Sequence, residues 1–153
     1  MVSEQNKPPK ASFIPTMREL AATYQAFASY ADTHIRKLGL TTCQFDVIAT
    51  LGNTQGMTMT ELAEKTLVTK GTLTGVIDRL ERKNLVYRQV VESDRRSFLI
   101  VLTPEGEKMF DRVFPVHIAY LKERERRLDP SELELLRVLL ARLRNAFESE
   151  KSF

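Results

Sequence analysis

The sequence predicts a mainly helical fold of the α+β class, in which short helices precede a single β-hairpin. One short helix is indicated by apolar residues that recur at steps of three and four, the pattern of a buried stripe: Leu73, Val76, Ile77 and Leu80. Two β-rich runs follow it, residues 85–91 and 97–102, and the charged segment 92–96 separates them. A helix followed by a hairpin with a basic tip is the layout of a winged helix-turn-helix.

Composition places limits on the class of protein. The chain has 153 residues, enough for one domain or two closely packed subdomains with an apolar core. Its net charge is only +3, so the position of the basic residues matters more than their number, and much of the excess lies in residues 67–102. The single cysteine, Cys43, excludes an intrachain disulfide and suits a reducing cytoplasm. No long uncharged apolar run is present, so no membrane span or membrane partner is expected.

The N-terminal part has the pattern of a tail and one long helix. Residues 1–12 are polar and contain two adjacent prolines, which is typical of a mobile tail. From Ile14 onward apolar residues fall at helical spacing until Gly39, which should stop the helix. This helix is longer than a small DNA-reading domain needs, so its apolar stripe must pack against a partner.

The pattern in the middle of the chain predicts two more short helices before the helix that carries Leu73 and Leu80. Thr41 or Thr42 is expected to cap a helix over residues 43–51, and residues 52–56 have turn chemistry. Residues 57–59 could add a small strand to the hairpin. Thr60 is expected to cap the next helix, with Leu62, Ala63 and Leu67 facing inward. Two short helices joined by a tight turn make a helix-turn-helix, so residues 41–103 are assigned as a winged helix-turn-helix DNA-binding region.

The C-terminal part predicts two further helices. Asn84 stands where a left-handed residue is wanted, Thr103 should cap the helix that begins at Pro104, and Pro115 should bend it. The last helix carries a stripe suited to a partner helix, and Leu135 and Leu139 make that stripe too wide for one chain to cover: Leu133, Leu136, Leu140, Leu143 and Phe147. Residues 13–40 and 104–153 are therefore assigned as a helical dimerisation region, and the chain is expected to form a homodimer.

Several segments together resemble the MarR family of winged-helix transcription regulators over nearly the whole chain. They are LTTCQFDVIATL (40–51), MTELAEKTLVTKGTLTGVIDRLERKNLV (59–86), SDRRSFLIVLTPEG (93–106) and the leucine-rich last helix. Asp94-Arg95-Arg96 followed by a strand and LTPEG is the most specific part. The resemblance implies a homodimer with intertwined terminal helices and a small-molecule or redox input. Three positions depart from the family pattern: Asn84, where glycine is common; Gly75, where a larger polar or basic residue is common; and Cys43, where proline or alanine is common.

The candidate DNA contacts lie on the predicted recognition helix and at the hairpin tip. On the helix they are Thr69, Lys70, Thr72, Thr74 and Arg79. Threonines can reach base edges or a thymine methyl, and Lys70 suits a phosphate. Arg95 suits a minor-groove or phosphate contact, and Arg96 is either a second phosphate ligand or a partner of Asp94. The alternatives are that the threonines only cap the helix and that the tip is a solvated turn.

Two kinds of signal input are considered. Cys43 near a helix N-terminus could hold a reactive thiolate, whereas the simpler interpretation is a small core residue. Aromatic residues at helical spacing could line a cavity for a small aromatic ligand, although such stripes are more often plain core: Phe27, Tyr30, His34, Phe45 and Phe114.

The function predicted from these residues is a homodimeric, sequence-specific DNA-binding transcription regulator that reads a pseudo-palindrome with half-sites about 10 bp apart. Repression is the expected outcome, although the residues themselves leave activation open. No phosphate loop, nucleophile elbow or metal-ligand spacing is present, so no enzyme, cofactor or metal site is expected. The alternative is a winged-helix module that docks a partner protein and does not bind DNA.

Overall fold

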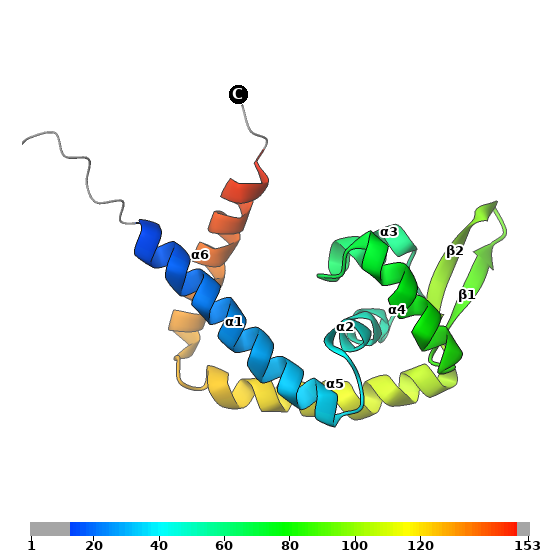
Figure 1. Ribbon diagram of the computed structural model, residues 1–153, viewed down its shortest axis with the longest axis horizontal. Coiled ribbons are helices and arrows are strands. Elements are labelled where there is room, and N and C mark those ends of the chain that lie inside the picture. The colour runs from blue at the N-terminus through cyan, green and yellow to red at the C-terminus, as the bar shows by residue number, and fades with distance from the viewer. Residues whose placement is uncertain (1–12, 150–153) are drawn as a thin grey trace, which may run out of the picture. The chain divides into compact units, whose positions relative to one another are not determined.

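The computed structural model describes residues 13–149, except for the side chain of Arg95. The predicted tail, 1–12, lies outside the described residues. The chain packs as two compact units, one that ends at Phe114 and one that begins at Pro115. Helices dominate both ends of the described chain, and a two-stranded antiparallel sheet lies between them in sequence (Figure 1). The predicted fold class is confirmed, while the use of the end helices in dimerisation stays a prediction.

The first two helices begin and end where local chemistry dictates. Helix α1 (Phe13–Lys37) ends just before Gly39, whose φ of +85° turns the chain away. Helix α2 (Thr42–Leu51) is capped by Thr41, one of the two predicted caps: Thr41 Oγ1 accepts the Gln44 amide at 3.2 Å, and Gln44 Oε1 accepts the Thr41 amide at 3.1 Å. This reciprocal pair satisfies two N–H groups that the first helical turn leaves without partners.

The predicted start of the third helix is wrong by two residues. Helix α3 spans Met59–Lys65, and Thr58 rather than Thr60 caps it. The Thr58 hydroxyl accepts the Glu61 amide at 3.1 Å, and the Glu61 carboxylate accepts the Thr58 amide at 2.8 Å. Thr58 is the cap because a glutamate stands three residues after it, whereas the residue three after Thr60 is an alanine and cannot reciprocate.

The prediction that Leu67 faces inward is also wrong, because its side chain is 85% exposed. Helix α3 has already ended, so helical spacing no longer governs the turn, and Thr66 and Val68 are buried instead. Helix α4 (Lys70–Arg82) then begins after its cap, Thr69. All four residues of the predicted apolar stripe of α4 are buried, which confirms that prediction.

Strands β1 (Val86–Val91) and β2 (Asp94–Leu102) form the hairpin beside α4 (Figure 1). The connection is shorter than predicted, since only Glu92 and Ser93 lie outside the strands. The backbone of residues 94–96 therefore belongs to β2, and the register shifts near the tip, between Val90 and Val91. The strand expected at 57–59 is reduced to one bridge, Met57 to Ile100.

The core of the first unit joins these elements. Its most deeply buried side chains come from α2, α3, α4, both strands and the first half of α5: Val47, Ile48, Leu51, Leu62, Leu73, Ile77, Leu80, Val86, Ile100 and Val113. The base of the hairpin is tied to the chain that follows α4. Asn84 has the predicted left-handed φ of 58°, and its carbonyl accepts the Thr103 hydroxyl at 2.6 Å. A Cβ at Gly106 would lie 2.0 Å from the Leu85 carbonyl oxygen, so only glycine allows this approach.

Helix α5 (Pro104–Glu125) begins with the predicted proline, and the Thr103 hydroxyl accepts the Gly106 amide at 3.0 Å. Pro115 lies inside α5, and the bend expected there stays a prediction. Helix α6 (Pro130–Glu148) is capped by Asp129 in a box with Glu132, and none of its residues is buried. Among the described residues, no helix combines the length and apolar character that a membrane span requires.

Candidate nucleic-acid interface

The first turn of α4 presents backbone amides and hydroxyl groups to solvent. Thr69, Lys70 and Thr72 are exposed, and no acidic residue occupies this turn. The Thr69 hydroxyl accepts the Thr72 amide at 3.4 Å and donates to Thr72 Oγ1 at 3.2 Å. Thr69 therefore acts as a cap, in line with the simpler interpretation, while the Thr72 hydroxyl keeps its own proton to donate. The positive end of a helix dipole beside a lysine suits an anion such as a phosphate.

The rest of the exposed face of α4 includes two glycines, which have no side chain. Thr74 and Arg79 are exposed, and Arg79 lies seven residues after Thr72, hence on the same side of the helix. A Cβ added at Gly71 or at Gly75, four residues apart, would meet no atom within 4 Å. Internal packing does not require either glycine, although glycine in a helix interior, the position of Gly75, costs about 1 kcal/mol relative to alanine. This face lets another molecule approach the helix backbone closely.

Arg88 on β1 fixes the hairpin to α4. Its Nη2 donates to Asp78 Oδ1 at 2.7 Å and its Nη1 donates to Glu81 Oε1 at 2.9 Å. The guanidinium carbon lies 5.6 Å from the centre of the Phe98 ring on β2. The hydrogen bond to Asp78 is the main reason that the pKa of Arg88 rises above its ordinary value. We call this contact of Arg88 with Asp78 and Glu81 the Arg88 clamp.

The hairpin tip is organised by Asp94. Its carboxylate accepts the Arg96 amide at 3.1 Å and the Ser97 hydroxyl at 3.0 Å. The aspartate thus holds the backbone of the tip, and the side chain of Arg96 is exposed. Arg96 also lines, with residues from the start of α3, a cavity of about 200 Å³. The side chain of Arg95 lies outside the described part of the structure, so its predicted contact stays a prediction.

The five candidate ligand-pocket residues all belong to the first unit. Phe27 is 52% exposed on α1, Tyr30 and His34 are half-buried on the same helix, and Phe45 of α2 is buried. Phe114 is half-buried and stacks on the buried Phe110 with ring centres 4.9 Å apart. Desolvation, and secondly the charge of Lys37, lowers the pKa of His34. Cys43 is half-buried in the first turn of α2. A ligand pocket formed by these residues stays a prediction.

Comparison with known proteins assigns the family. A sequence model of the MarR family matches residues 40–98. The HTH-type transcriptional regulator YfiV of Bacillus subtilis is 31% identical over 115 residues, which cover 75% of this chain and 72% of YfiV. The HTH-type transcriptional regulator MhqR of the same organism is 29% identical over 124 residues, 81% of this chain and 86% of MhqR. The chain belongs to the MarR family.

Solved MarR-family structures share its fold. AbsC from Streptomyces coelicolor superposes with a TM-score of 0.84 at 26% identity, covering 95% of this chain and all of AbsC (100%). A mutant of MarR from E. coli, in complex with operator DNA, gives 0.76 at 25% identity, covering 90% of this chain and 99% of that one. The winged-helix fold expected from the resemblance is confirmed, and MarR proteins are transcription regulators rather than enzymes.

Sequence reasoning missed two features of this site. It counted Arg88 only as part of the positive charge of the segment, whereas two carboxylates on α4 already bind its guanidinium. It also noted Gly75 only as a departure from the family pattern. Pairing Arg88 with Asp78 requires knowing that β1 folds back along α4, which helical spacing alone does not reveal. The alternation of β1 could have indicated it, since Arg88 lies on the same side of the strand as the buried Val86.

Replacing Arg88 with methionine should destabilise the first unit by about 1 kcal/mol, a value discounted because all three side chains are partly exposed to solvent. Methionine keeps much of the side-chain volume but leaves Asp78 and Glu81 unpaired. Urea unfolding monitored by circular dichroism measures the loss, which should shrink in 1 M NaCl. The matched control is Arg112→Met, at an arginine that contacts the Met109 sulfur. Equal stability of Arg88→Met and wild type would show that the clamp contributes nothing.

Proposed function

We propose that this MarR-family protein is a homodimeric, sequence-specific DNA-binding repressor that reads a pseudo-palindromic operator with α4 and the hairpin. The main support for the proposal is that two exposed features belong to one unit, in which the Arg88 clamp joins α4 to the hairpin. One feature is the face of α4 that carries threonine hydroxyl groups, and the other is the side chain of Arg96. The E. coli MarR mutant, 25% identical, was crystallised with operator DNA, which supports the same use of this fold here.

In the proposed complex α4 enters the major groove. Thr72 and Thr74 can hydrogen-bond to base edges or pack on thymine methyl groups, while Lys70 neutralises a phosphate. Gly71 and Gly75 let the helix backbone approach the bases, which gives a use to two residues that otherwise weaken the helix. Arg95 and Arg96 reach the phosphates or the minor groove beside it, and Arg79 adds positive charge.

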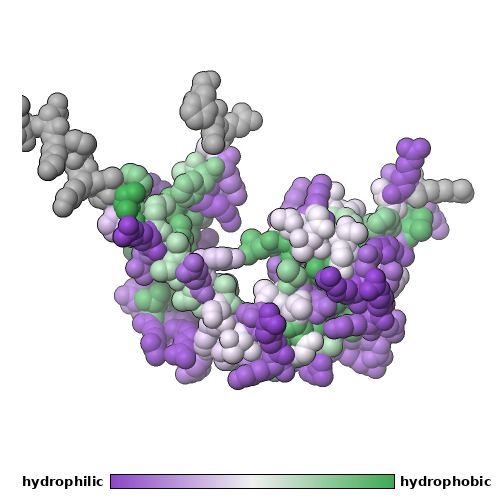
Figure 2. Space-filling view, viewed as in Figure 1, coloured by the Kyte–Doolittle hydropathy of each residue, from purple (hydrophilic) through white to green (hydrophobic). Residues whose placement is uncertain are grey.

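A second copy of the chain is the proposed partner of α6. No residue of α6 is buried, and six of its large apolar side chains are exposed: Leu135, Leu136, Val138, Leu139, Leu140 and Phe147. Figure 2 shows this apolar surface in green along α6. A monomer in water would not keep so contiguous an apolar helix face uncovered. A two-fold dimer would repeat α4 about 10 bp along the duplex, the spacing of pseudo-palindromic half-sites.

Repression is the proposed outcome, because a dimer seated on an operator occupies DNA that the transcription machinery needs. Its proposed place of action is the cytoplasm, where it can reach that DNA.

The proposed release signal is a small aromatic ligand bound beside Phe27, Tyr30 and His34, and oxidation of Cys43 is the alternative. If peroxide abolishes DNA binding by wild type but not by Cys43→Ser, oxidation of the thiol is the release signal. If both proteins keep binding DNA under peroxide, the small ligand is the remaining candidate.

Wild-type protein should bind duplex DNA with an affinity that falls as salt is added. Arg95→Ala and Arg96→Ala should each weaken binding similarly on all sequences and reduce the salt slope of the dimer by about two units, because each removes one phosphate contact from each protomer. Thr72→Ala should instead change the preferred sequence. Fluorescence anisotropy on a duplex selected from a random pool, at several NaCl concentrations, measures both effects.

Arg112→Ala, at an exposed arginine on α5, serves as the control for loss of one positive charge outside α4 and the hairpin and should leave the slope unchanged. An unaltered affinity and slope in both wing variants would remove the hairpin from the mechanism. No binding of wild type to any duplex, even at low salt, would instead support the protein-interaction module.

The dimer is tested by placing a charge on the exposed face of α6. Leu136→Asp combined with Leu140→Asp should convert the protein to a monomer and weaken operator binding by about 100-fold or more, because the two half-sites are then bound independently. Sedimentation equilibrium measures the mass, and circular dichroism checks that the helices remain. Glu134→Lys, at an exposed α6 residue that pairs with Arg137, is the control for a changed charge. A wild-type protein that sediments as a monomer at micromolar concentration would contradict the proposal.

A further inference from the structure

One side of α2 carries two polar side chains that the DNA-reading role leaves unused. Thr42 begins the helix and Asp46 follows four residues later, so both lie on the same side of α2. Each is hydrogen-bonded to a different segment of the first unit, Thr42 to α1 and Asp46 to the turn that precedes α4. Helix α2 therefore connects α1 to the start of the recognition helix.

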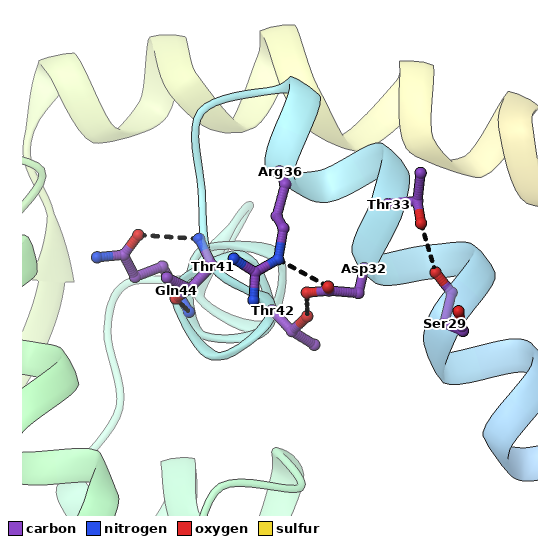
Figure 3. A network of polar contacts seen from close by, with 7 residues as sticks. All are labelled: Ser29, Asp32, Thr33, Arg36, Thr41, Thr42 and Gln44. Carbon is purple, nitrogen blue, oxygen red and sulfur yellow. Dashed lines mark hydrogen bonds and ion pairs between the residues drawn. The ribbon is translucent and has the colours of Figure 1, made fainter.

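The contact with α1 is a three-residue network (Figure 3). Asp32 Oδ1 accepts the Thr42 hydroxyl at 2.8 Å, and Asp32 Oδ2 accepts Arg36 Nε at 2.7 Å. The hydrogen bond from Arg36, followed by that from Thr42, lowers the pKa of the Asp32 carboxylate. Its two oxygens are thus directed to fixed partners, and the end of α1 is oriented on the start of α2.

The contact with the turn reaches its backbone. Asp46 Oδ2 accepts the Leu67 amide at 3.1 Å, across 21 residues of sequence. The turn also has internal bonds, from the Thr66 hydroxyl to the Leu62 carbonyl at 2.6 Å and from the Val68 amide to Thr66 Oγ1 at 3.3 Å. These internal bonds shape the turn, but they do not fix it to another helix. Asp46 of α2 supplies that attachment at Leu67, which lies two residues before Thr69, the cap of α4.

We propose that Asp46 is a positioning residue for DNA recognition: by holding the Leu67 amide it sets where α4 begins, and Asp32 with Thr42 fixes the start of α2 to α1. The inference rests on the proposed function. Side chains that read base edges must be held within a fraction of an ångström. If the turn before α4 lost its hydrogen bond to Asp46, discrimination between base sequences should therefore fall more than affinity for the phosphate backbone.

This predicts a change in sequence discrimination without a matching change in electrostatics. Asp46→Ala should reduce the ratio of affinities for a selected duplex and a shuffled duplex of equal composition by about tenfold, the effect of losing one hydrogen bond to a charged group. The salt slope should remain that of wild type, because the phosphate contacts persist. Asp46→Asn keeps an acceptor oxygen for the Leu67 amide and should recover most of the ratio.

A merely structural role would give a different pattern. General destabilisation lowers the melting temperature and the active fraction, which reduces both affinities together and leaves their ratio unchanged. Amide hydrogen exchange gives an independent readout, since the Leu67 amide should exchange faster in Asp46→Ala than in Asp46→Asn while amides within α4 keep their protection. Asp111→Ala, at an exposed carboxylate on α5, controls for the loss of one negative charge.

The contact between the start of α2 and α1 is tested by a double-mutant cycle. Asp32→Ala and Thr42→Val should each lower the discrimination ratio in the same direction as Asp46→Ala, and their combination should be no worse than Asp32→Ala alone, because both substitutions remove the hydrogen bond between Thr42 and Asp32. If wild type discriminates between the duplexes and Asp46→Ala keeps the full ratio, the positioning role is wrong although the DNA-binding proposal stands. If wild type binds no duplex, the proposed function itself has failed.

Discussion

The geometry of this protein depends on one constraint, that α4 and the hairpin keep a fixed relation to each other. The shared buried core and the Arg88 clamp supply it together, and in the clamp one guanidinium binds carboxylates three residues apart on α4 and lies over an aromatic ring of the opposite strand. Arginine suits this role because its planar fork can serve two carboxylates at once, which the single ammonium of lysine does less well. In the proposed DNA complex, α4 and the hairpin can act together only if their spacing matches the grooves.

Much of the fold could be predicted because its signals are local. The buried stripe of α4, the left-handed Asn84 and the proline that opens α5 each follow from a few neighbouring residues. Two errors arose where local signals compete. Thr58 and Thr60 are both plausible caps until the position of Glu61 is considered, and Leu67 looks like a core residue until the end of α3 is known.

The candidate site was harder to predict because its contacts cross between elements. The sequence indicated which residues would be exposed on α4, and the structure agrees for Thr69, Lys70, Thr72, Thr74 and Arg79. It could not indicate that Arg88 is already paired or that Asp46 binds the backbone of a turn 21 residues away. Both contacts require the three-dimensional path of the chain. The exposed apolar face of α6 was visible in the sequence, because a stripe that wide has no cover within one chain.

Hydroxyl-radical footprinting of the protein on a duplex that it selects from a random pool tests whether α4 and the hairpin read DNA together. We expect two protected regions related by a dyad and centred about 10 bp apart, each flanked by minor-groove protection that disappears in Arg95→Ala and Arg96→Ala. One continuous protected patch without a dyad, or flanking protection that persists in both arginine variants, would contradict it. Either result would mean that α4 and the hairpin do not read the duplex together.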